Sequence, residues 1–377
     1  MAKLGDFFTI ASGGTPDKRS PSYYENGTIP WVKTGDLKNQ YVPAGIECIT
    51  EEGLNNSSAK LFPPNTVLVA MYGATIGACS ILTYEAATNQ ACAAFLPNKN
   101  VLPTYLYYFL SSKREQFVKD GVGGAQPNIS AGYLKNVQFG LIPMQQQIDI
   151  VEKLDKVEKL IVLRKEQLAK LDQLVKSRFI ELFGDQKANP FGWPQTTIGD
   201  CCTLKSGTSL PADKENEGGR IPYVKVGDMN YPGNEQYITT SSRFVTEQTA
   251  GAGIFPVGTV IFPKRGGAIG TNKKRLTTLP ICADLNVMGV TAGNALKSQY
   301  LMAYFNMVDL GALDNGSSVP QINNKDIAPL VICLPPLALQ EQFAAFVEQT
   351  DKSKLAIQRS LNKLELLKKA LMQEYFG

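Results

Sequence analysis

The chain has 377 residues, of which 44% are hydrophobic and 19% charged, so it can form two globular domains and is too apolar to be disordered. It contains no histidine, which excludes histidine-based acid–base catalysis, Ser-His-Asp and Cys-His nucleophile pairs, and zinc sites with a histidine ligand. The net charge of +4 is spread evenly along the chain, so binding to a nucleic acid would depend on locally arranged side chains.

The cysteines and the N-terminus point to a cytoplasmic protein. Seven cysteines form an odd set without a C-x-x-C spacing, so neither a metal cluster nor a disulfide framework is expected. The adjacent Cys201 and Cys202 are interpreted as small residues in a strand rather than as a redox switch. The first residues lack a signal pattern and no run approaches the ~20 apolar residues of a membrane span, so we expect no membrane partner.

An internal repeat covers the chain from end to end. The segment IPWVKTGD at 29–36 recurs as IPYVKVGD at 221–228. At a shift of 193, Gln147 matches Gln340 and Phe183 matches Phe376. Self-similarity at such a long period indicates a duplicated architecture.

Each half begins with a part rich in Gly and Pro. Short β-branched runs such as 66–69 and 259–262, bounded by turn residues, predict strands in a mixed α+β domain. One helix per half is expected near 103–119 and 298–310. These parts should form two similar globular domains.

The remainder of each half predicts a long helix. Residues 145–183 contain neither Pro nor Gly, and apolar residues recur in a 3-4 spacing that is typical of a coiled-coil seam. The two helices must pair with each other or with partner helices, and antiparallel pairing about a pseudo-two-fold axis is the simplest arrangement. The predicted packing residues are Ile150, Leu154, Val157, Ile161, Leu168, Leu171, Val175, Phe343, Val347, Ile357, Leu361, Leu364 and Leu371.

The repeated I-P-[WY]-V-K-x-G-D motif, together with Ser12–Pro16 and a globular–helix–globular–helix order, resembles the specificity subunit of type I restriction-modification systems. The resemblance covers all 377 residues. It implies target-recognition domains at 1–143 and 185–336, and conserved helices at 144–184 and 337–377. The expected fold class is α+β, with two similar mixed α/β domains joined by two long antiparallel coiled-coil helices in pseudo-two-fold symmetry.

The resemblance also implies a non-catalytic function. Each domain would read one half of a split, asymmetric target in double-stranded DNA, and the helices would space the domains. Modification subunits would methylate adenine, and restriction subunits would join that complex for ATP-dependent cleavage. S-adenosylmethionine, ATP and Mg are expected on those partner subunits, with no cofactor bound by this chain.

The sequence provides no catalytic motif of its own. Asn189–Gly192, NPFG, resembles the adenine-binding step of amino methyltransferases but lacks the second proline, so we interpret it as a linker turn. The segments 73–77 and 266–270 lack the Lys of a phosphate-binding loop and are interpreted as turns. No acidic cluster has the spacing of a Mg²⁺ nuclease site. We therefore predict no catalytic or metal-binding residues.

Three regions per half carry side chains suited to DNA. Lys264 and Arg265 follow a predicted strand, and Tyr72 takes the place of Arg265 in the first half. The run Lys273, Lys274 and Arg275 suits phosphate oxygens, although a solvated hairpin tip fits the run equally well. The third region is a Pro/Gly loop, which either carries amides for adenine or is a plain turn. Its candidate residues are Gln126, Asn128 and Gln321.

Two further assignments stay open. Lys33 and Lys225, in the repeated motif, either contact phosphate or pair with Asp36 and Asp228 to fix a turn, while Trp31 and Tyr223 are expected in the core. Apolar residues left on the helix surfaces suit either docking of the modification subunit or packing against the domains. These residues are Val151, Leu160, Leu163 and Leu174.

Two other functions compete with the leading hypothesis. The chain could be a stand-alone DNA methyltransferase or nuclease with an unrecognised site, which tight S-adenosylmethionine binding would support. It could also be a scaffold whose repeated domains bind proteins, which weak and sequence-independent DNA binding would support.

Overall fold

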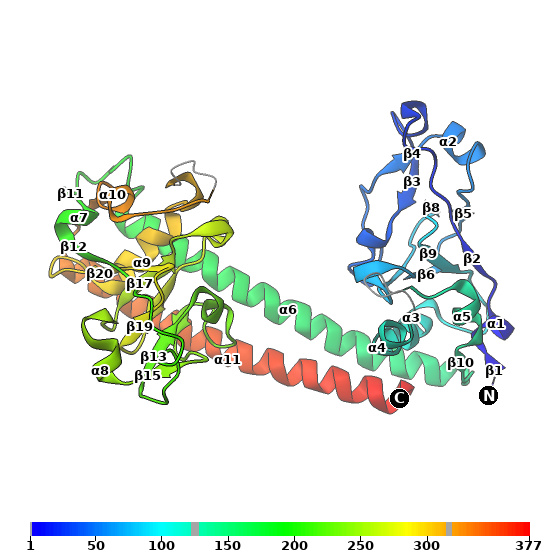
Figure 1. Ribbon diagram of the computed structural model, residues 1–377. Helices are drawn as coiled ribbons and strands as arrows, with labels where there is room; N and C mark the ends of the chain where they lie inside the picture. The colour runs from blue at the N-terminus through cyan, green and yellow to red at the C-terminus, as the bar shows by residue number, and fades with distance from the viewer. Residues whose placement is uncertain (1, 122–127, 314–318) are drawn as a thin grey trace. The chain divides into compact units, whose positions relative to one another are not determined.

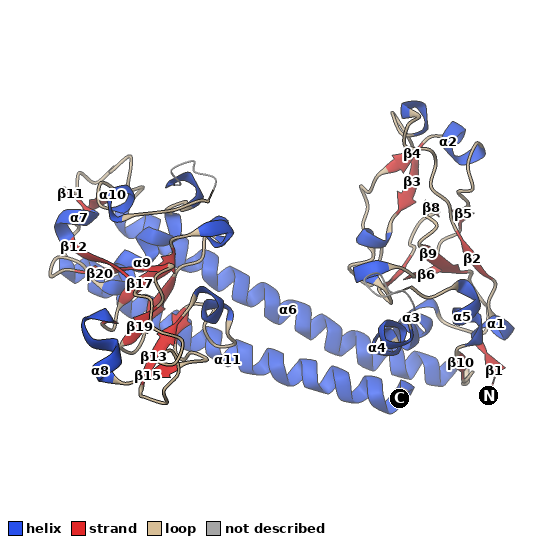
Figure 2. Cartoon of the chain, in the orientation of Figure 1, coloured by secondary structure: helices blue, strands red, loops and turns tan. Residues whose placement is uncertain are grey.

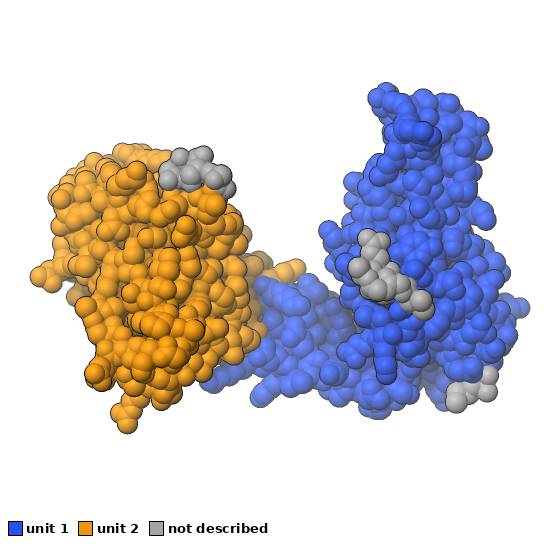
Figure 3. Space-filling model, in the orientation of Figure 1, with its two compact units in different colours: residues 1–165, 359–377 blue, residues 166–358 orange. Residues whose placement is uncertain are grey.

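The computed structural model describes residues 2–121, 128–313 and 319–377. The chain divides into two compact units, which Figure 3 colours separately: unit 1 contains residues 1–165 and 359–377, and unit 2 contains residues 166–358. Each unit consists of one domain of mixed helices and strands and of part of each of two long helices (Figure 2). The α+β prediction of two similar domains and two long helices is confirmed.

Two four-stranded sheets form the domain of unit 1 (Figure 1). The first is antiparallel, in the order β2 (Ile10–Ser12), β9 (Cys92–Phe95), β6 (Val67–Ala70) and β7 (Cys79–Ile81). The second has the order β4 (Cys48–Ile49), β3 (Ile29–Val32), β8 (Ala86–Thr88) and β5 (Leu61–Phe62). Within it, β3 and β8 run parallel, so their carboxyl ends lie side by side.

The domain of unit 2 repeats this plan. Its first sheet has the order β12 (Cys202–Ser206), β20 (Val287–Ala292), β17 (Thr259–Pro263), β18 (Arg275–Thr277) and β14 (Tyr237–Ile238). The second has the order β15 (Phe244–Val245), β13 (Ile221–Val224), β19 (Ile281–Ala283) and β16 (Ile254–Phe255). Here β13 and β19 are the parallel pair, and the IPYV segment forms β13 as the IPWV segment forms β3.

The central strand β6 is a continuous apolar run because both of its faces are buried. In β6, Val67 and Val69 pack with α3 (Pro103–Ser112), whereas Leu68 and Ala70 pack toward the second sheet. Successive side chains of a strand point to opposite faces, and here both faces are buried. In unit 2, β17 and α9 (Ser298–Met307) form the same layers.

Short elements complete each domain. In unit 1, β1 (Ala2–Lys3) pairs with β10 (Gln138–Phe139), and β11 (Gln195–Thr197) pairs with β21 (Val331–Cys333) in unit 2. The remaining α-helices of the domains are α1 (Leu4–Phe7), α2 (Glu51–Asn55), α4 (Arg114–Asp120), α5 (Ala131–Asn136), α7 (Ile198–Cys201), α8 (Glu247–Ala250) and α10 (Asn324–Ile327). The predicted helix near 103–119 is therefore divided into α3 and α4.

The two long helices are α6 (Met144–Phe183) and α11 (Leu337–Phe376). Within unit 1 they are antiparallel, because Lys153 contacts Tyr375 at 3.4 Å and Glu158, further along α6, pairs with Lys368 at 2.5 Å. All the predicted packing residues lie at buried or half-buried positions. None of the described helices is long and apolar enough to cross a membrane.

The helices α6 and α11 are also antiparallel within unit 2. There Asp172 pairs with Lys354 at 2.6 Å, and the ring of Phe179, further along α6, lies 5.4 Å from the ring of Phe343. Of the two alternatives left open for Val151, packing against the domain is the one that the structure supports, because Val151 is only 9% exposed in the core of unit 1.

A buried glutamine attaches the start of each long helix to its domain. The Gln147 carbonyl oxygen accepts from the backbone N–H of Leu102 at 2.9 Å, and its amide donates to the carbonyls of Asn100 and Ile142. Gln340 accepts from the backbone N–H of Lys297 at 2.8 Å and donates to two carbonyls in the same way. Both side chains are fully buried.

The end of each helix closes a domain core. Phe376, at the end of α11, packs against Tyr105 and Phe109 in unit 1, with ring centroids 5.4 and 6.1 Å away. Phe183, at the end of α6, lies 4.7 Å from Tyr300 in unit 2. The next residues form a turn in which Asn189 bonds to Trp193, as interpreted from the NPFG segment.

Replacing the buried glutamines should destabilise the protein. Gln147→Met and Gln340→Met keep the approximate side-chain length but leave a buried backbone N–H without an acceptor, which costs about 1–3 kcal/mol. Urea unfolding followed by circular dichroism measures the loss. The control is Gln146→Met at an exposed neighbouring position, where we expect a change within about 0.5 kcal/mol. Equal stability of Q147M and Q146M would contradict the assignment.

Candidate nucleic-acid interface

The loop after the central strand presents a different side chain in each unit. Tyr72 follows β6 and is 45% exposed, and the exposed Arg265 takes the same place after β17. Each precedes a glycine with a positive φ, +66° at Gly73 and +72° at Gly266. This left-handed conformation turns the chain into a short 3-10 helix and favours glycine. The repeated glycines therefore hold Tyr72 and Arg265 at equivalent points of two equal turns.

The third predicted region meets this loop. Isolated β-bridges join Tyr72 to Asn128 and Arg265 to Gln321. Backbone hydrogen bonds continue them, from the N–H of Ile129 to Met71 at 3.0 Å and from the N–H of Ile322 to Lys264 at 2.9 Å. Two regions far apart in sequence thus lie side by side in both units. Gln126 lies outside the described residues.

Lys264 is more enclosed than Arg265. Its ammonium donates to the Ser206 hydroxyl of β12 at 2.9 Å. Desolvation lowers the pKa of Lys264, and the positive charge of Arg265 lowers it further. The guanidinium of Arg265 is therefore the more accessible cation of this loop.

A further turn borders the interface and was missed by the sequence analysis. The backbone N–H of Met71 donates to Ala91, and that of Lys264 donates to Asn286, both at 2.8 Å. Gln90 is exposed, and the Asn286 amide donates to Asp284 at 2.6 Å. The signal was present, since an amide residue lies within three residues of a short strand-like run in both halves, in AATNQ at 86–90 and in ICADLN at 281–286.

The lysine of the repeated motif is held by a glutamate. Lys33 pairs with Glu47, and Lys225 binds both carboxylate oxygens of Glu215 at 2.6 Å. Asp36 and Asp228 fix the turn through the backbone of the lysine rather than through its ammonium. Each carboxylate accepts from the lysine backbone N–H at 2.8 Å.

The rings that precede these lysines form part of the core. Trp31 and Tyr223 are buried, as expected. The ammonium of Lys33 lies 5.9 Å from the ring of Trp31, and that of Lys225 lies 5.7 Å from the ring of Tyr223. Each lysine side chain therefore extends over a buried aromatic ring at the carboxyl end of a strand.

The run 273–275 is not an exposed phosphate patch. Lys274 is only 4% exposed and donates to the Asn272 side chain at 2.7 Å and to the carbonyl of Val308 at 2.6 Å. Arg275 donates to the backbone carbonyls of Met229, Asn234 and Lys274. Lys273 contacts the Asn230 side chain.

The phosphate-binding assignments of Lys274 and Arg275 are therefore corrected. The residues enter strand β18 instead of forming a hairpin tip, so their cations turn into the domain. Lys274 there binds the carbonyl that follows α9, where the negative end of the helix dipole favours a cation.

The duplicated domains and their matching loops define a class of protein. Two copies of one α+β domain present guanidinium, amide and phenol groups from matching loops, and both domains pack on paired long helices. Such a chain is a duplicated recognition protein. The family comparison makes this specific: residues 1–173 and 190–366 match the type I restriction modification DNA specificity domain, and the chain belongs to this family.

Individual relatives agree with this assignment. The chain is 25% identical over 400 residues to the type I restriction enzyme MjaIX specificity subunit of Methanocaldococcus jannaschii, covering 99% of this chain and 91% of the relative. It is 29% identical over 154 residues to the EcoR124I/EcoR124II specificity subunit of Escherichia coli, covering 40% of this chain and 38% of the relative.

Solved structures share the fold. One solved structure concerns the complex assembly and conformational transition of the type I restriction-modification system. It has a TM-score of 0.62 at 18% identity, and the match covers 100% of this chain and 96% of that chain. The specificity subunit from M. genitalium has a TM-score of 0.58 at 16% identity, covering 100% and 95%. The protein is a non-catalytic specificity subunit.

The buried Lys274 predicts a pH dependence of stability. Burial lowers the pKa of Lys274 from the usual 10.5 to about 8. Between these values the unfolded chain binds more protons at this residue than the folded chain, so its contribution to the free energy of unfolding rises with pH. Below about pH 8 the ammonium is charged in both states and this rise is absent.

The measurement compares the wild type with Lys274→Met by urea unfolding at pH 7.5, 9 and 10. All other titrating groups are common to the two proteins, so the difference between their unfolding free energies isolates Lys274. We expect this difference to grow in favour of the wild type as the pH rises. A difference that is constant or shrinks would contradict the assignment.

Proposed function

We propose that the chain directs a type I restriction-modification complex to a bipartite, asymmetric target in double-stranded DNA. Residues 1–143 and 185–336 act as recognition domains for the two half-sites, and the helices at 144–184 and 337–377 connect them. Modification subunits methylate adenine with S-adenosylmethionine, and restriction subunits use ATP and Mg for cleavage. The complex acts in the cytoplasm, where it meets host and incoming DNA.

One observation carries this proposal: the two units present chemically different side chains at equivalent points. Arg265 stands where unit 1 has Tyr72, and Gln321 stands where it has Asn128. A DNA-binding domain reads bases by such donor and acceptor patterns, so unequal loops on equal folds suit two different half-sites. Unequal domains therefore support an asymmetric target.

The side-chain chemistry indicates which bases each domain contacts. Arg265 suits the O6 and N7 atoms of guanine, and Gln321 suits adenine. In the first domain, Asn128 and the sequence-predicted Gln126 suit adenine, and the Tyr72 ring suits apolar contact with a thymine methyl group. Lys264 and Lys273 are proposed as phosphate contacts of the second domain.

The parts of the long helices in each unit carry exposed leucines suited to contact with the modification subunit. Leu160 and Leu163 are each 43% exposed on α6, and Leu174 is 48% exposed. On α11, Leu366 is 68% exposed. Apolar side chains at the centre of an interface are the ones that gain most from being covered by a partner. We assign these leucines to contacts with the modification subunit.

The decisive experiment is methylation sequencing. DNA from a host that carries this chain with its modification subunit is compared with DNA from a host that carries the modification subunit alone. We expect N6-methyladenine within one split asymmetric motif, only when both are present. Exchanging residues 185–336 for those of a relative should change one half-site and leave the other. If no methylated motif is found, a pull-down tests whether the chain binds the modification subunit. Binding would indicate a silent complex, and the absence of binding would indicate a protein scaffold.

Arg265 gives a residue-level prediction. Arg265→Ala should relax the target at one guanine position of the second half-site, because a bidentate Arg–guanine contact is worth about 1–3 kcal/mol of discrimination. Methylation sequencing then shows the other bases at that position. The control is Arg220→Ala, which removes an equal charge from an exposed position before β13. An unchanged motif in R265A would contradict the assignment.

A further inference from the structure

The two units differ in charge beside the repeated lysine. Glu47 and Arg243 occupy equivalent positions, because Pro30 pairs with Cys48 as Pro222 pairs with Phe244. The carbonyl of Glu47 accepts from Trp31 at 2.8 Å, and that of Arg243 accepts from Tyr223 at 2.9 Å. The backbone ladder is thus the same, and the side chain changes from an anion to a cation.

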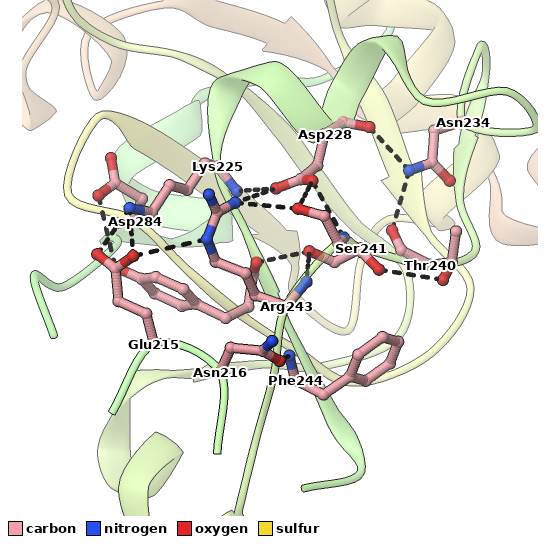
Figure 4. A network of polar contacts seen from close by, with 12 residues as sticks. Glu215, Asn216, Lys225, Asp228, Asn234, Thr240, Ser241, Arg243, Phe244 and Asp284 are labelled. Atoms are coloured by element: carbon pink, nitrogen blue, oxygen red, sulfur yellow. Dashed lines mark hydrogen bonds and ion pairs between the residues drawn. The ribbon is translucent and has the colours of Figure 1, made fainter. Parts of the chain in front are cut away.

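This change leaves two cations together in unit 2. In unit 1 the ammonium of Lys33 pairs with Glu47 across the strand pair. In unit 2 the corresponding lysine, Lys225, instead faces Arg243. The two are bridged by Glu215, which binds Lys225 at 2.6 Å and the Nε of Arg243 at 3.5 Å (Figure 4).

Glu215 reaches the cations from a separate segment, which is fixed along the exposed edge of β15. The Asn216 side chain accepts from the backbone N–H of Phe244 at 3.0 Å, and Glu217 accepts from the backbone N–H of Thr246 at 3.0 Å. The hydrogen bonds from the side chain of Thr249 and from Thr246 lower the pKa of Glu217 to about 2. The backbone beside Glu215 is therefore held by the two residues that follow it, while the carboxylate itself contacts Lys225 and Arg243.

The two other acids in the network are already committed, and Asp284 accepts from the backbone N–H and the amide of Asn286. Asp228 is 4% exposed and accepts from the backbone N–H of Lys225 at 2.8 Å and from the Ser242 hydroxyl at 2.7 Å. Its distance to Arg243 is 3.9 Å. The charges of Lys225 and Arg243 are thus balanced at the surface mainly by Glu215.

We propose that Lys225 and Arg243 form a site for a DNA backbone phosphate that is specific to the second domain, in which Glu215 takes the place of the phosphate in the free protein. This inference rests on the proposed DNA recognition. In the first domain, the carboxylate of Glu47 stands at the place of Arg243 and repels a phosphate. The two domains therefore hold the backbone of their half-sites differently.

The exchange of a carboxylate for a phosphate is favourable here on simple grounds. The side chains of Lys225, Glu215 and Arg243 are 31%, 23% and 36% exposed, so the ion pairs are half-buried and all three groups still reach solvent. A phosphate offers the same two cations more acceptor oxygens, and its binding releases condensed counterions from DNA.

The site is also connected to the loops assigned to base reading. Lys225 lies over the ring of Tyr223, whose hydroxyl donates to the carbonyl of Thr208 at 3.0 Å and lies 3.4 Å from the carboxylate of Asp284. Asn286 donates to Asp284 at 2.6 Å, and its carbonyl accepts from the N–H of Lys264. A chain of contacts inside the domain thus joins Lys225 to the backbone of the loop that carries Arg265.

The test measures DNA binding by the complex of the full chain with its modification subunit. Fluorescence anisotropy is recorded with a duplex that carries the methylated motif and with a scrambled duplex, from about 50 to 300 mM salt. Arg243→Gln should weaken binding to both duplexes by an equal factor of about three to ten, and should reduce the slope of log K against log salt by about 1. Arg243→Lys should restore the slope, and Arg220→Gln is the charge-matched control.

Glu215→Gln should change the affinity for DNA in the opposite direction. Removing the competing carboxylate should raise the affinity for both duplexes by about threefold or more without reducing the slope. These substitutions leave the strand pairing in place, because Arg243 takes part in it through its backbone. Circular dichroism and co-purification with the modification subunit check the fold of each variant.

Several outcomes would overturn the site. They are an unchanged slope in R243Q, a slope that R243K does not restore, a lower affinity in E215Q, or an altered methylation motif in R243Q. The scrambled duplex separates this site from the proposed function. Equal affinity of the wild type for both duplexes would refute sequence recognition, while the loss of slope in R243Q on the scrambled duplex would still support the phosphate site.

Discussion

The architecture depends on one buried side-chain amide in each unit. Gln147 and Gln340 each satisfy one backbone N–H and two carbonyls at the point where a long helix leaves its domain. An amide is the only neutral side-chain group that both donates and accepts in this way, and an unpaired buried polar group is costly. The helix start is therefore fixed in direction, and the seam residues that follow are aimed at the partner helix.

Duplication separates the residues that hold the fold from the residues that we propose recognise a target. Gln147 and Asp36 keep their identity and their hydrogen bonds in the second unit, as Gln340 and Asp228. Tyr72 and Glu47 keep only their backbone contacts and become Arg265 and Arg243. Conserved geometry with altered chemistry is what two readers of different half-sites require, and a single domain could not have shown this distinction.

The sequence predicted the repeat and the long helices, because each depends on local pattern or on self-similarity. The assignment of the loops to base reading stays a prediction. It did not predict that the side chains of Lys274 and Arg275 turn into the domain, since a run of charges does not reveal which side chains a strand turns inward. The partnership of Glu215 with Arg243 was also out of reach. It joins segments that are distant in sequence, and the repeat offered no guide because Glu215 serves in unit 2 the role of Glu47 in unit 1.

A near-balanced net charge is compatible with binding a polyanion when the cations are held by replaceable partners. Lys33 and Lys225 are each matched by a surface glutamate, so the free domains carry little local excess charge. In the site proposed for the second domain, a phosphate gains Lys225 only where it displaces the carboxylate of Glu215, whereas Glu47 stays paired with Lys33 in the first domain. Under the proposed function, a docked duplex must both displace this carboxylate and match the loops, and this double requirement would keep the affinity for arbitrary DNA low.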